Sequence, residues 1–210
     1  MSQEKDVRLE DVAESKAELD DKARKMLEDK DADSRMRIYE GPLGKAIIVL
    51  LCVWTAFQLY FTTIGAISAI NLRAIHCIFL LLFTFLLFPT YKKEKRRRKL
   101  PPIWDWVFIL GSIGSFTYLI LNYTRIAQTG GRISDMEVGI ALVAIVCVFE
   151  AARRASGNLA ILAAVFLAYN WFGAYLPGYF GHNGFTLKRV LITQFWGTQG
   201  LLGTGIGVSA

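Results

Sequence analysis

The chain has 210 residues, of which 53% are hydrophobic and 20% are charged, and its formal net charge is +6. The apolar residues stand in blocks long enough to span a bilayer, which excludes an ordinary soluble domain. Charge is unevenly spread along the chain. Residues 1–34 hold twelve of the eighteen acids against seven Lys and Arg, so this part is net negative and the remainder is net positive.

The N-terminal segment, residues 1–37, is predicted to be an acidic cytoplasmic tail. It is rich in strong helix formers and has few apolar positions, which favours a solvated, partly helical segment. Val12, Leu19 and Met26 recur every seven residues, so a short coiled coil stays open as the alternative. The first apolar block begins near residue 43, behind these acids rather than behind a short basic region. It therefore predicts a retained span and not a signal peptide.

Five apolar segments are long enough for a helix that crosses a hydrocarbon core of roughly 30 Å. They cover about residues 43–66, 72–90, 103–123, 136–152 and 158–176. Pro89 stops the second segment, and the pair Pro101 and Pro102 opens the third. The blocks are continuous rather than alternating. The sequence therefore predicts an all-α, polytopic helical membrane protein with about five transmembrane helices.

Lys and Arg are divided unequally between the segments that join these spans. With the N-terminus in the cytoplasm, the inside segments hold nineteen Lys and Arg and the outside segments hold five. Much of the inside charge lies in the run "KKEKRRRK" at 92–99, which we interpret as a topology anchor and a contact for anionic membrane lipids. Nucleic-acid binding is not expected of so short a loop between two spans. The bias predicts a multi-pass protein with its N-terminus inside and residue 177 outside.

The segment that follows the fifth span predicts a short interfacial helix and then the start of a sixth membrane helix. Thr186 is placed to cap the interfacial helix, with Lys188 and Arg189 off its buried face and Trp196 at its end. That face is formed by Leu187, Val190, Leu191, Gln194 and Phe195. From residue 201 a glycine-rich run heads back toward the bilayer. We expect the chain to be the N-terminal part of a longer protein.

Gln58 and His76 are the polar residues deepest in the predicted spans, and Asn170 lies in the fifth span. Polar residues at membrane depth are candidate functional groups. A hydrogen bond between Gln58 and His76 would satisfy both side chains, so a structural and a functional interpretation of the pair stay open. Asn170 has the same two interpretations, because Tyr169 and Trp171 beside it belong to a predicted aromatic belt.

Two carboxylates near the ends of spans have structural explanations. Asp105 falls in the first turn after the two prolines, where the helix dipole favours a negative charge, so we expect it to cap the helix. Glu150 precedes Arg153 and Arg154 by three and four residues on one predicted helix. This spacing predicts an ion pair at the membrane interface.

Several classes of chemistry lack the residues that they need. The sequence contains no nucleophile elbow, no phosphate-binding glycine loop and no metal-ligand cluster, and only His76 offers a histidine at membrane depth for haem. Cys52, Cys77 and Cys147 each lie in an apolar block, and we expect them to be small buried hydrophobic residues. The sequence therefore predicts no enzyme, no catalytic residue, no metal site and no cofactor.

From about residue 150 onward the sequence resembles a known membrane family. The stretches that carry the resemblance are "EAARRASG" at 150–157, "FLAYNWFGAYLPGYFGHNGFTLKRVL" at 166–191 and "TQGLLGTGIGVSA" at 198–210. They place Leu-Pro-Gly, His-x-Gly, Leu-x-Arg and Gly-Val-Ser-Ala in this order. In this they are similar to the fused permeases of the tripartite ATP-independent periplasmic (TRAP) transporters. The resemblance is to the branch with four plus twelve membrane helices that works with TAXI-type binding proteins.

The resemblance implies a secondary transporter of the inner (cytoplasmic) membrane that takes up organic anions or related solutes. A periplasmic solute-binding protein would deliver the solute, and sodium would be the coupling ion. Residues 38–152 would correspond to the family's small four-helix membrane domain, a static scaffold. Residues 153–210 would hold the fifth helix, the outer loop with its interfacial helix, and the beginning of the large permease portion. The substrate and sodium sites of the family lie in that large portion, so no substrate-binding residue is carried over to this chain.

The loop "PGYFGHNGFTLKR" at 177–189 is predicted on the outer face. We assign its His182, Lys188 and Arg189 to the surface that meets the binding protein. Two other interpretations stay open. The first is a stand-alone membrane adaptor or assembly protein that moves no solute. The second, which the missing residues make the weaker one, is a membrane enzyme or electron carrier, for which haem absorbance of the purified protein would be the evidence.

Overall fold

The computed structural model describes residue 20 and residues 36–39, 41–65, 67–91, 97–98, 100–130 and 132–209. The chain divides into two compact units, Met1–Met36 and Arg37–Ala210, and the second contains every helix and strand named below. Most of the predicted tail, and the side chains of the basic run at 92–99, lie outside the described residues. The solvated, partly helical tail therefore stays a prediction, and the short coiled coil stays its alternative.

Helix α2 spans Pro42–Ile64, and both of its ends carry residues that suit a helix boundary. Pro42 lies in the first turn, where a missing N–H costs no hydrogen bond. Gly65 follows the last turn with φ 66°, a left-handed conformation that glycine adopts readily, and donates its N–H to the Phe61 carbonyl. Among the residues of α2 only Ile47 is buried, so this helix contributes little to the core.

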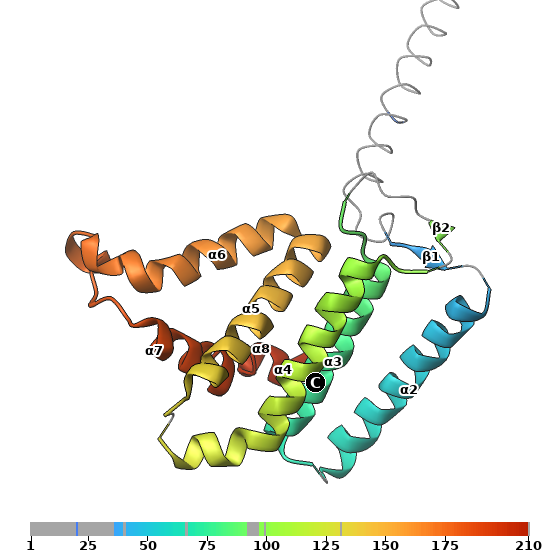
Figure 1. The fold of residues 1–210 in the computed structure, drawn as a ribbon, viewed down its shortest axis with the longest axis horizontal. Coiled ribbons are helices and arrows are strands. Elements are labelled where there is room, and N and C mark those ends of the chain that lie inside the picture. Colours follow the sequence, from blue (N-terminus) through green and yellow to red (C-terminus); the bar gives the residue numbers. More distant parts are fainter. Residues whose placement is uncertain are drawn as a thin grey trace, which may run out of the picture. The chain divides into compact units, whose positions relative to one another are not determined.

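Helices α3 (Ala69–Leu87) and α4 (Ile103–Gln128) form the centre of the unit and lie side by side (Figure 1). Helix α3 ends before Pro89, because proline disfavours a helical backbone at the preceding residue, and Phe88 is extended. Helix α4 begins directly after Pro101 and Pro102, as the sequence predicts. Large side chains from both helices, among them Phe85 and Phe116, are fully buried between them and their neighbours.

Helix α5 (Asp135–Ala155) packs beside α4 and begins with a capping box. The Ser134 hydroxyl accepts a hydrogen bond from the Glu137 N–H, and the Glu137 carboxylate accepts one from the Ser134 N–H. A single non-helical residue, Ser156, separates α5 from α6 (Gly157–Phe172). Figure 1 shows α6 running away from α5 at this joint. Only Ala160 of α6 is buried.

The segment after α6 consists of short elements. They are the 3₁₀ turns η2 (Gly173–Tyr175) and η3 (Gly178–Phe180), helix α7 (Leu187–Leu191), the π-helical turn η4 (Ile192–Trp196) and helix α8 (Thr204–Ser209). Thr186 caps α7 by accepting a hydrogen bond from the Arg189 N–H at 3.4 Å, as the sequence predicts. The predicted sixth helix corresponds to α8, which begins at Thr204.

The face of the predicted interfacial helix at 187–195 packs in part against the neighbouring helices. Its buried residues are Val190, Leu191 and Phe195, followed by Trp196. Phe195 meets Phe116 of α4 edge-on with ring centroids 5.4 Å apart, and Trp196 meets Tyr118 in the same way at 6.0 Å. These aromatic contacts cover Phe195 and Trp196 with protein, whereas Leu187 is 43% exposed, so a position at the membrane interface stays a prediction.

Among the described residues, four helical segments are long and apolar enough to cross a membrane: α2, α3, α4 and Gly157–Tyr175. The prediction of an all-α helical protein is confirmed, whereas its span count is not. The remaining predicted span, 136–152, lies within α5. This helix carries charged side chains at both ends, Asp135 and Glu137 in its first turn and Arg153 and Arg154 in its last.

One feature of the fold is not helical. Strand β1 (Ile38–Tyr39) pairs in parallel with strand β2 (Arg97–Arg98). The pair joins the segment before α2 to the connection between α3 and α4 (Figure 1). Two residues are too short for an alternating pattern to reveal a strand, so the sequence does not predict this ladder.

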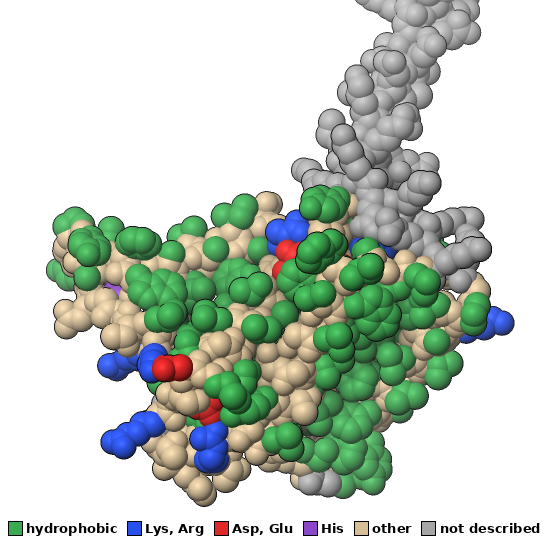
Figure 2. All heavy atoms as spheres, in the orientation of Figure 1, with side chains coloured by type: hydrophobic (Ala, Val, Ile, Leu, Met, Phe, Trp, Pro, Cys, Tyr) green, Lys and Arg blue, Asp and Glu red, His purple; other side chains and the backbone are tan. Residues whose placement is uncertain are grey.

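The surface in Figure 2 is largely apolar, with the described Lys, Arg, Asp and Glu side chains gathered at its edges. Exposed large hydrophobic residues occur on all four of the long apolar segments. Cys77 and Cys147 are buried as predicted, but Cys52 is exposed, because α2 packs so little of its surface against the core. These observations identify a membrane protein by the length and composition of its helices.

Candidate functional site

A group of charged side chains with a buried centre lies where α5 ends, and we name it the Asp105 cluster. Its members are Arg37, Asp105, Glu150, Arg153 and Arg154. Asp105 is completely buried and accepts hydrogen bonds from Arg37 Nη1 at 2.5 Å and from Arg154 Nη1 at 2.7 Å. A carboxylate buried without cations would be very costly, so the two guanidinium groups are what allow Asp105 to remain in the interior.

The guanidinium groups of the Asp105 cluster also bind the end of α3. Arg37 donates to the carbonyls of Phe85 and Leu86, which are among those that a helix leaves unpaired at its C-terminus. Arg154 lies over the rings of Phe85 and Phe108 at 5.0 and 5.5 Å from their centroids. The cluster therefore joins α3, α4, α5 and the residue that precedes β1.

The predictions for the two carboxylates of this cluster have different outcomes. Glu150 accepts hydrogen bonds from both Arg153 and Arg154, at 2.7 and 2.8 Å, so the predicted ion pair is confirmed. Asp105 lies in the first turn of α4 as expected, but the prediction that it caps the helix is wrong. Its oxygens bind arginines from two other segments instead, because burial leaves them no solvent partner.

A second ionic contact lies where α5 begins. Glu137 is 1% exposed, and its carboxylate accepts hydrogen bonds from Arg125 of α4 and from the Ser134 N–H. Tyr118 also donates to it, at 3.4 Å. Our sequence interpretation missed this contact, although Ser134-x-x-Glu137 is a readable capping-box signal. Helices α4 and α5 are thus joined by charge at both ends.

Lys188 connects α7 to the same end of α5. Its Nζ atom donates to the Asp135 carboxylate at 2.8 Å, and both side chains are largely exposed. The hydrogen bond and positive charge of Lys188 lower the pKa of Asp135 below its ordinary value. The chain leaves α5 at Ser156 and has returned to its beginning by Lys188, so α6 and residues 173–186 together run the length of α5.

A cavity lies between α5 and α6, and we name it the α5–α6 cavity. Its volume is about 280 Å³. Its lining residues are Ile145, Val148, Phe149 and Ala152 of α5, Ala163, Phe166, Leu167 and Asn170 of α6, and Gln194 and Leu201. A second hollow of about 180 Å³, lined by Asn170, Phe185, Arg189, Val190, Thr193 and Gln194, shares Asn170 and Gln194 with it. The two spaces therefore adjoin, one lined mainly by apolar side chains and the other by polar ones.

The polar groups of the cavity are held by the backbone around them. Asn170 Nδ2 donates to the carbonyls of Phe166 and Leu167, both at 3.1 Å, which leaves its side-chain oxygen free to accept. Gln194 lies in the π-helical turn, a geometry often found at functional sites. A Cβ atom at Gly200 would lie 2.3 Å from the Gln194 carbonyl oxygen, so only glycine allows this close approach.

Arg189 lies at the polar hollow, and its guanidinium is 5.2 Å from the Phe185 ring centroid. Among the described residues no carboxylate pairs with it, in contrast to Lys188 one position earlier. Asn170 and Arg189 are therefore two predicted site residues that the fold brings together. Gln194, which the sequence interpretation placed on a packing face, joins them.

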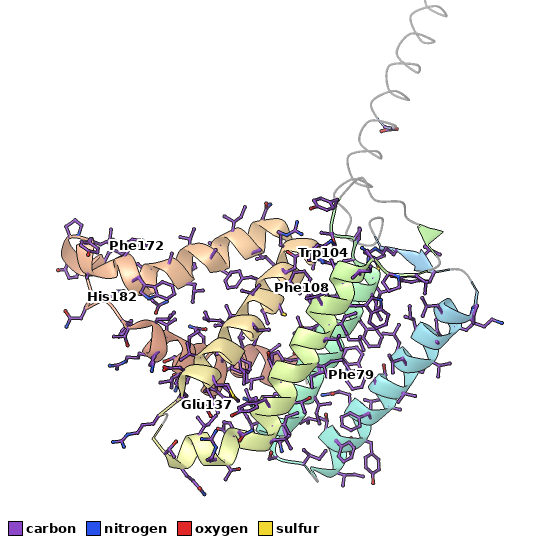
Figure 3. All side chains as sticks on the ribbon, viewed as in Figure 1. Phe79, Trp104, Phe108, Glu137, Phe172 and His182 are labelled. Carbon is purple, nitrogen blue, oxygen red and sulfur yellow. The ribbon has the colours of Figure 1, made fainter. Side chains whose placement is uncertain are left out.

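His182 does not line the cavity. Its ring lies against Tyr169 and Phe185, and Nε2 is 3.1 Å from the Tyr169 carbonyl oxygen. A Cβ atom at Gly173 would meet this ring at 2.0 Å, so glycine makes room for it. Figure 3 shows His182 near the end of α6 that holds Phe172, well away from Glu137. His182 therefore packs the loop onto α6.

Gln58 and His76 do not form the hydrogen bond that the structural interpretation of this pair requires. Neither amide atom of Gln58, nor His76 Nδ1, has a hydrogen-bond partner among the described residues. His76 instead lies beside the Trp54 ring, with centroids 5.4 Å apart. The sparse packing of α2 against α3 is made by aromatic rings, such as that of Phe79 in Figure 3, and not by the amide, so this hydrogen bond does not explain the two polar groups.

The described part of the chain contains no group of three or more His, Cys, Asp or Glu side chains that could hold a metal ion. The lining of the α5–α6 cavity and its polar hollow contains no carboxylate, thiol or histidine. The arrangement offers apolar surface, two amides, a hydroxyl and one guanidinium, which are groups for binding and orienting a molecule. No family model, no curated protein and no solved structure matches this chain.

Proposed function

We propose that this chain is the membrane scaffold segment of a TRAP-type secondary transporter that takes up organic anions or related solutes. A periplasmic solute-binding protein delivers the solute, a larger permease portion, fused or separate, carries it across, and a sodium gradient drives uptake. The sequence resemblance over residues 150–210 suggests the family. The four long apolar segments are consistent with a membrane location.

The observation that carries the proposal is the contrast between α5 and α6, the two helices that meet at Ser156. Before it, ion pairs join α4 and α5 at both ends, and at one end the fully buried Asp105 also binds Arg37, which holds the end of α3. After it, α6 is apolar but buries only Ala160. A static scaffold needs helices that are fixed to one another by such ion pairs. A helix to which further membrane helices bind needs an apolar surface that is not yet buried. The resemblance begins close to this joint, within the last turn of α5.

We place the chain in the inner membrane with its N-terminus in the cytoplasm. The Lys188–Asp135 ion pair supports a common side for the α4–α5 connection and the 177–189 loop, both of which the charge bias assigns to the outside. On that side we assign His182, Lys188 and Arg189 to the surface that meets the solute-binding protein. His182 shapes this loop by packing on Tyr169, and the exposed Arg189 supplies a positive charge.

Uptake into spheroplasts tests the proposal. Cells that express the complete native gene product are compared with a deletion strain for uptake of a panel of labelled carboxylates. Periplasmic extract is added back or withheld, and the sodium gradient is imposed or collapsed. We expect uptake only when gene product, extract and inward sodium gradient are all present.

Two results would contradict the proposal. Uptake that continues without periplasmic extract would show that no binding protein is required. Uptake that is equally fast without a sodium gradient would show that sodium is not the coupling ion. If no labelled solute enters under any condition while the protein is correctly inserted, the adaptor interpretation replaces the transporter. Correct insertion is checked by protease protection of a tag placed at the N-terminus.

A further inference from the structure

We propose that the α5–α6 cavity binds one acyl chain of an anionic phospholipid, with the phosphate of the lipid at Arg189. The inference needs only that α6 is in contact with a membrane. It does not depend on transport, so it can hold where the proposed function fails and fail where that function holds.

The interior of the cavity suits a hydrocarbon chain. Its walls are branched and aromatic side chains, with Ile145 and Val148 on one side and Phe166 and Leu167 on the other. The two walls diverge from the one-residue joint at Ser156, so the space between them is a wedge that protein side chains do not fill. Phe166 is 64% exposed, which leaves the wedge accessible from the α6 side. An empty apolar space of this size in a bilayer would take up lipid rather than water.

The mouth of the cavity suits a negatively charged headgroup. Arg189 has no carboxylate partner among the described residues, while its neighbour Lys188 is paired with Asp135. A guanidinium presents several N–H donors in a geometry that matches phosphate oxygens. The Arg189 side chain is held over the Phe185 ring, which limits where its charge can lie. The positive charge of Arg189 is therefore held at a fixed place beside the apolar cavity.

The amides of the mouth suit the hydroxyl groups of a glycerol headgroup. The free oxygen of Asn170 accepts a hydrogen bond, and the Gln194 side chain makes none with the described residues, so its amide can both donate and accept. No acidic side chain lines the hollow to repel an anion. Among anionic lipids, phosphatidylglycerol combines one phosphate charge with headgroup hydroxyls, and it is the occupant to which we commit.

Native mass spectrometry of the delipidated full chain in detergent tests the charge requirement. The protein is titrated with palmitoyl-oleoyl phosphatidylglycerol and, separately, with the matching phosphatidylcholine. We expect one phosphatidylglycerol to bind about fivefold more tightly than phosphatidylcholine, since one arginine near a membrane surface contributes about that much. R189Q should abolish this preference, and K188Q should keep it. A preference that survives R189Q, or that K188Q removes equally, would overturn the proposal.

Two phenylalanine substitutions on adjacent positions of α6 test the place of the acyl chain. Ala163 lines the cavity, whereas Ala164 does not, and both are exposed, so neither change disturbs the core. A163F fills the wedge and should weaken binding of both lipids about tenfold, which corresponds to the loss of about two buried methylene groups. A164F should leave binding unchanged. Equal lipid binding by A163F and the unsubstituted chain, with the helical content of both intact, would show that the cavity is not the site.

Discussion

Helices α5 and α6 follow each other with one residue between them, yet they are held in opposite ways. Helix α5 is fixed at its beginning by Glu137 and Arg125 and at its end by the Asp105 cluster. Helix α6 has no ion pair among its described residues and buries only Ala160. Polar interactions in this chain thus lie at the ends of α5, where helices pack against one another. The surface of α6 is apolar and is left free for lipid or further helices.

The largest effect is expected when the buried carboxylate of Asp105, which holds α3, α4 and α5 together, loses its charge. D105N leaves the guanidinium groups of Arg37 and Arg154 without their carboxylate, and we expect a loss of about 3–5 kcal/mol in the free energy of unfolding. Unfolding in mixed detergent micelles, followed by circular dichroism, measures it. E150Q is the matched control, since Glu150 is on the outer side of the cluster, and should cost clearly less. A D105N protein as stable as the parent would mean that the cluster is not what fixes α3, α4 and α5.

The second largest effect is expected from an aromatic residue of the π-helical turn. F195A removes a fully buried ring that meets Phe116 edge-on, and the cavity left behind should cost about 3–5 kcal/mol in the free energy of unfolding. The same change on α6, F166A, should alter the free energy of unfolding by less than about 0.5 kcal/mol. Equal losses for the two variants would show that α6 is as tightly packed as the bundle.

A smaller effect is expected at the capping box of α5. S134A removes the hydroxyl that accepts from the Glu137 N–H and should destabilise the protein by about 1 kcal/mol. Amide hydrogen exchange should then quicken in the first turn of α5 and stay unchanged in its last turn. Faster exchange along the whole helix would mean that the two ends are not held independently.

The smallest effect is a pH dependence at the ion pair between α7 and α5. Lys188 lowers the pKa of Asp135 in the folded protein. The ion pair therefore contributes fully to stability above the pKa of Asp135 in the unfolded chain, which is about 4. This contribution is lost as the pH falls through the lower pKa of Asp135 in the folded protein. K188Q should remove this contribution and make the α7 region equally accessible to protease at pH 6 and pH 3. The parent should become more accessible only at the acid end. Identical pH profiles for the two proteins would contradict a role for the pair in solution.

The accuracy of the sequence interpretation depended on how far apart the interacting residues lie along the chain. Glu150 with Arg153 and Arg154 is a local pair on one helix, and the helix period alone predicts it. Asp105 meets Arg37 and Arg154 across separations of 68 and 49 residues, which no local pattern encodes. Its burial could not be inferred from a position that also suits a helix cap.

The candidate site was predictable only in part, for the same reason. Asn170 and Arg189 were identified by their chemistry, as a polar group in a span and a charge in an outer loop. Gln194 was assigned to a packing face because a regular α-helix would put it there, whereas the π-helical turn brings it to the cavity. The cavity itself follows from the direction that α6 takes after Ser156, and hydrophobic periodicity contains no information about that direction.

Because a single residue, Ser156, joins α5 to α6, a small rotation at this joint would move the far end of α6 by a large distance. A helix of 16 residues is about 24 Å long, so a rotation of about 10° at the joint would carry its far end through about 4 Å. Because Arg154 is anchored two residues before the joint, such a rotation would leave the bundle where it is. The displacement would be largest at Phe172 and in the loop that His182 holds against α6, so this loop would respond to small changes at the opposite end of α6.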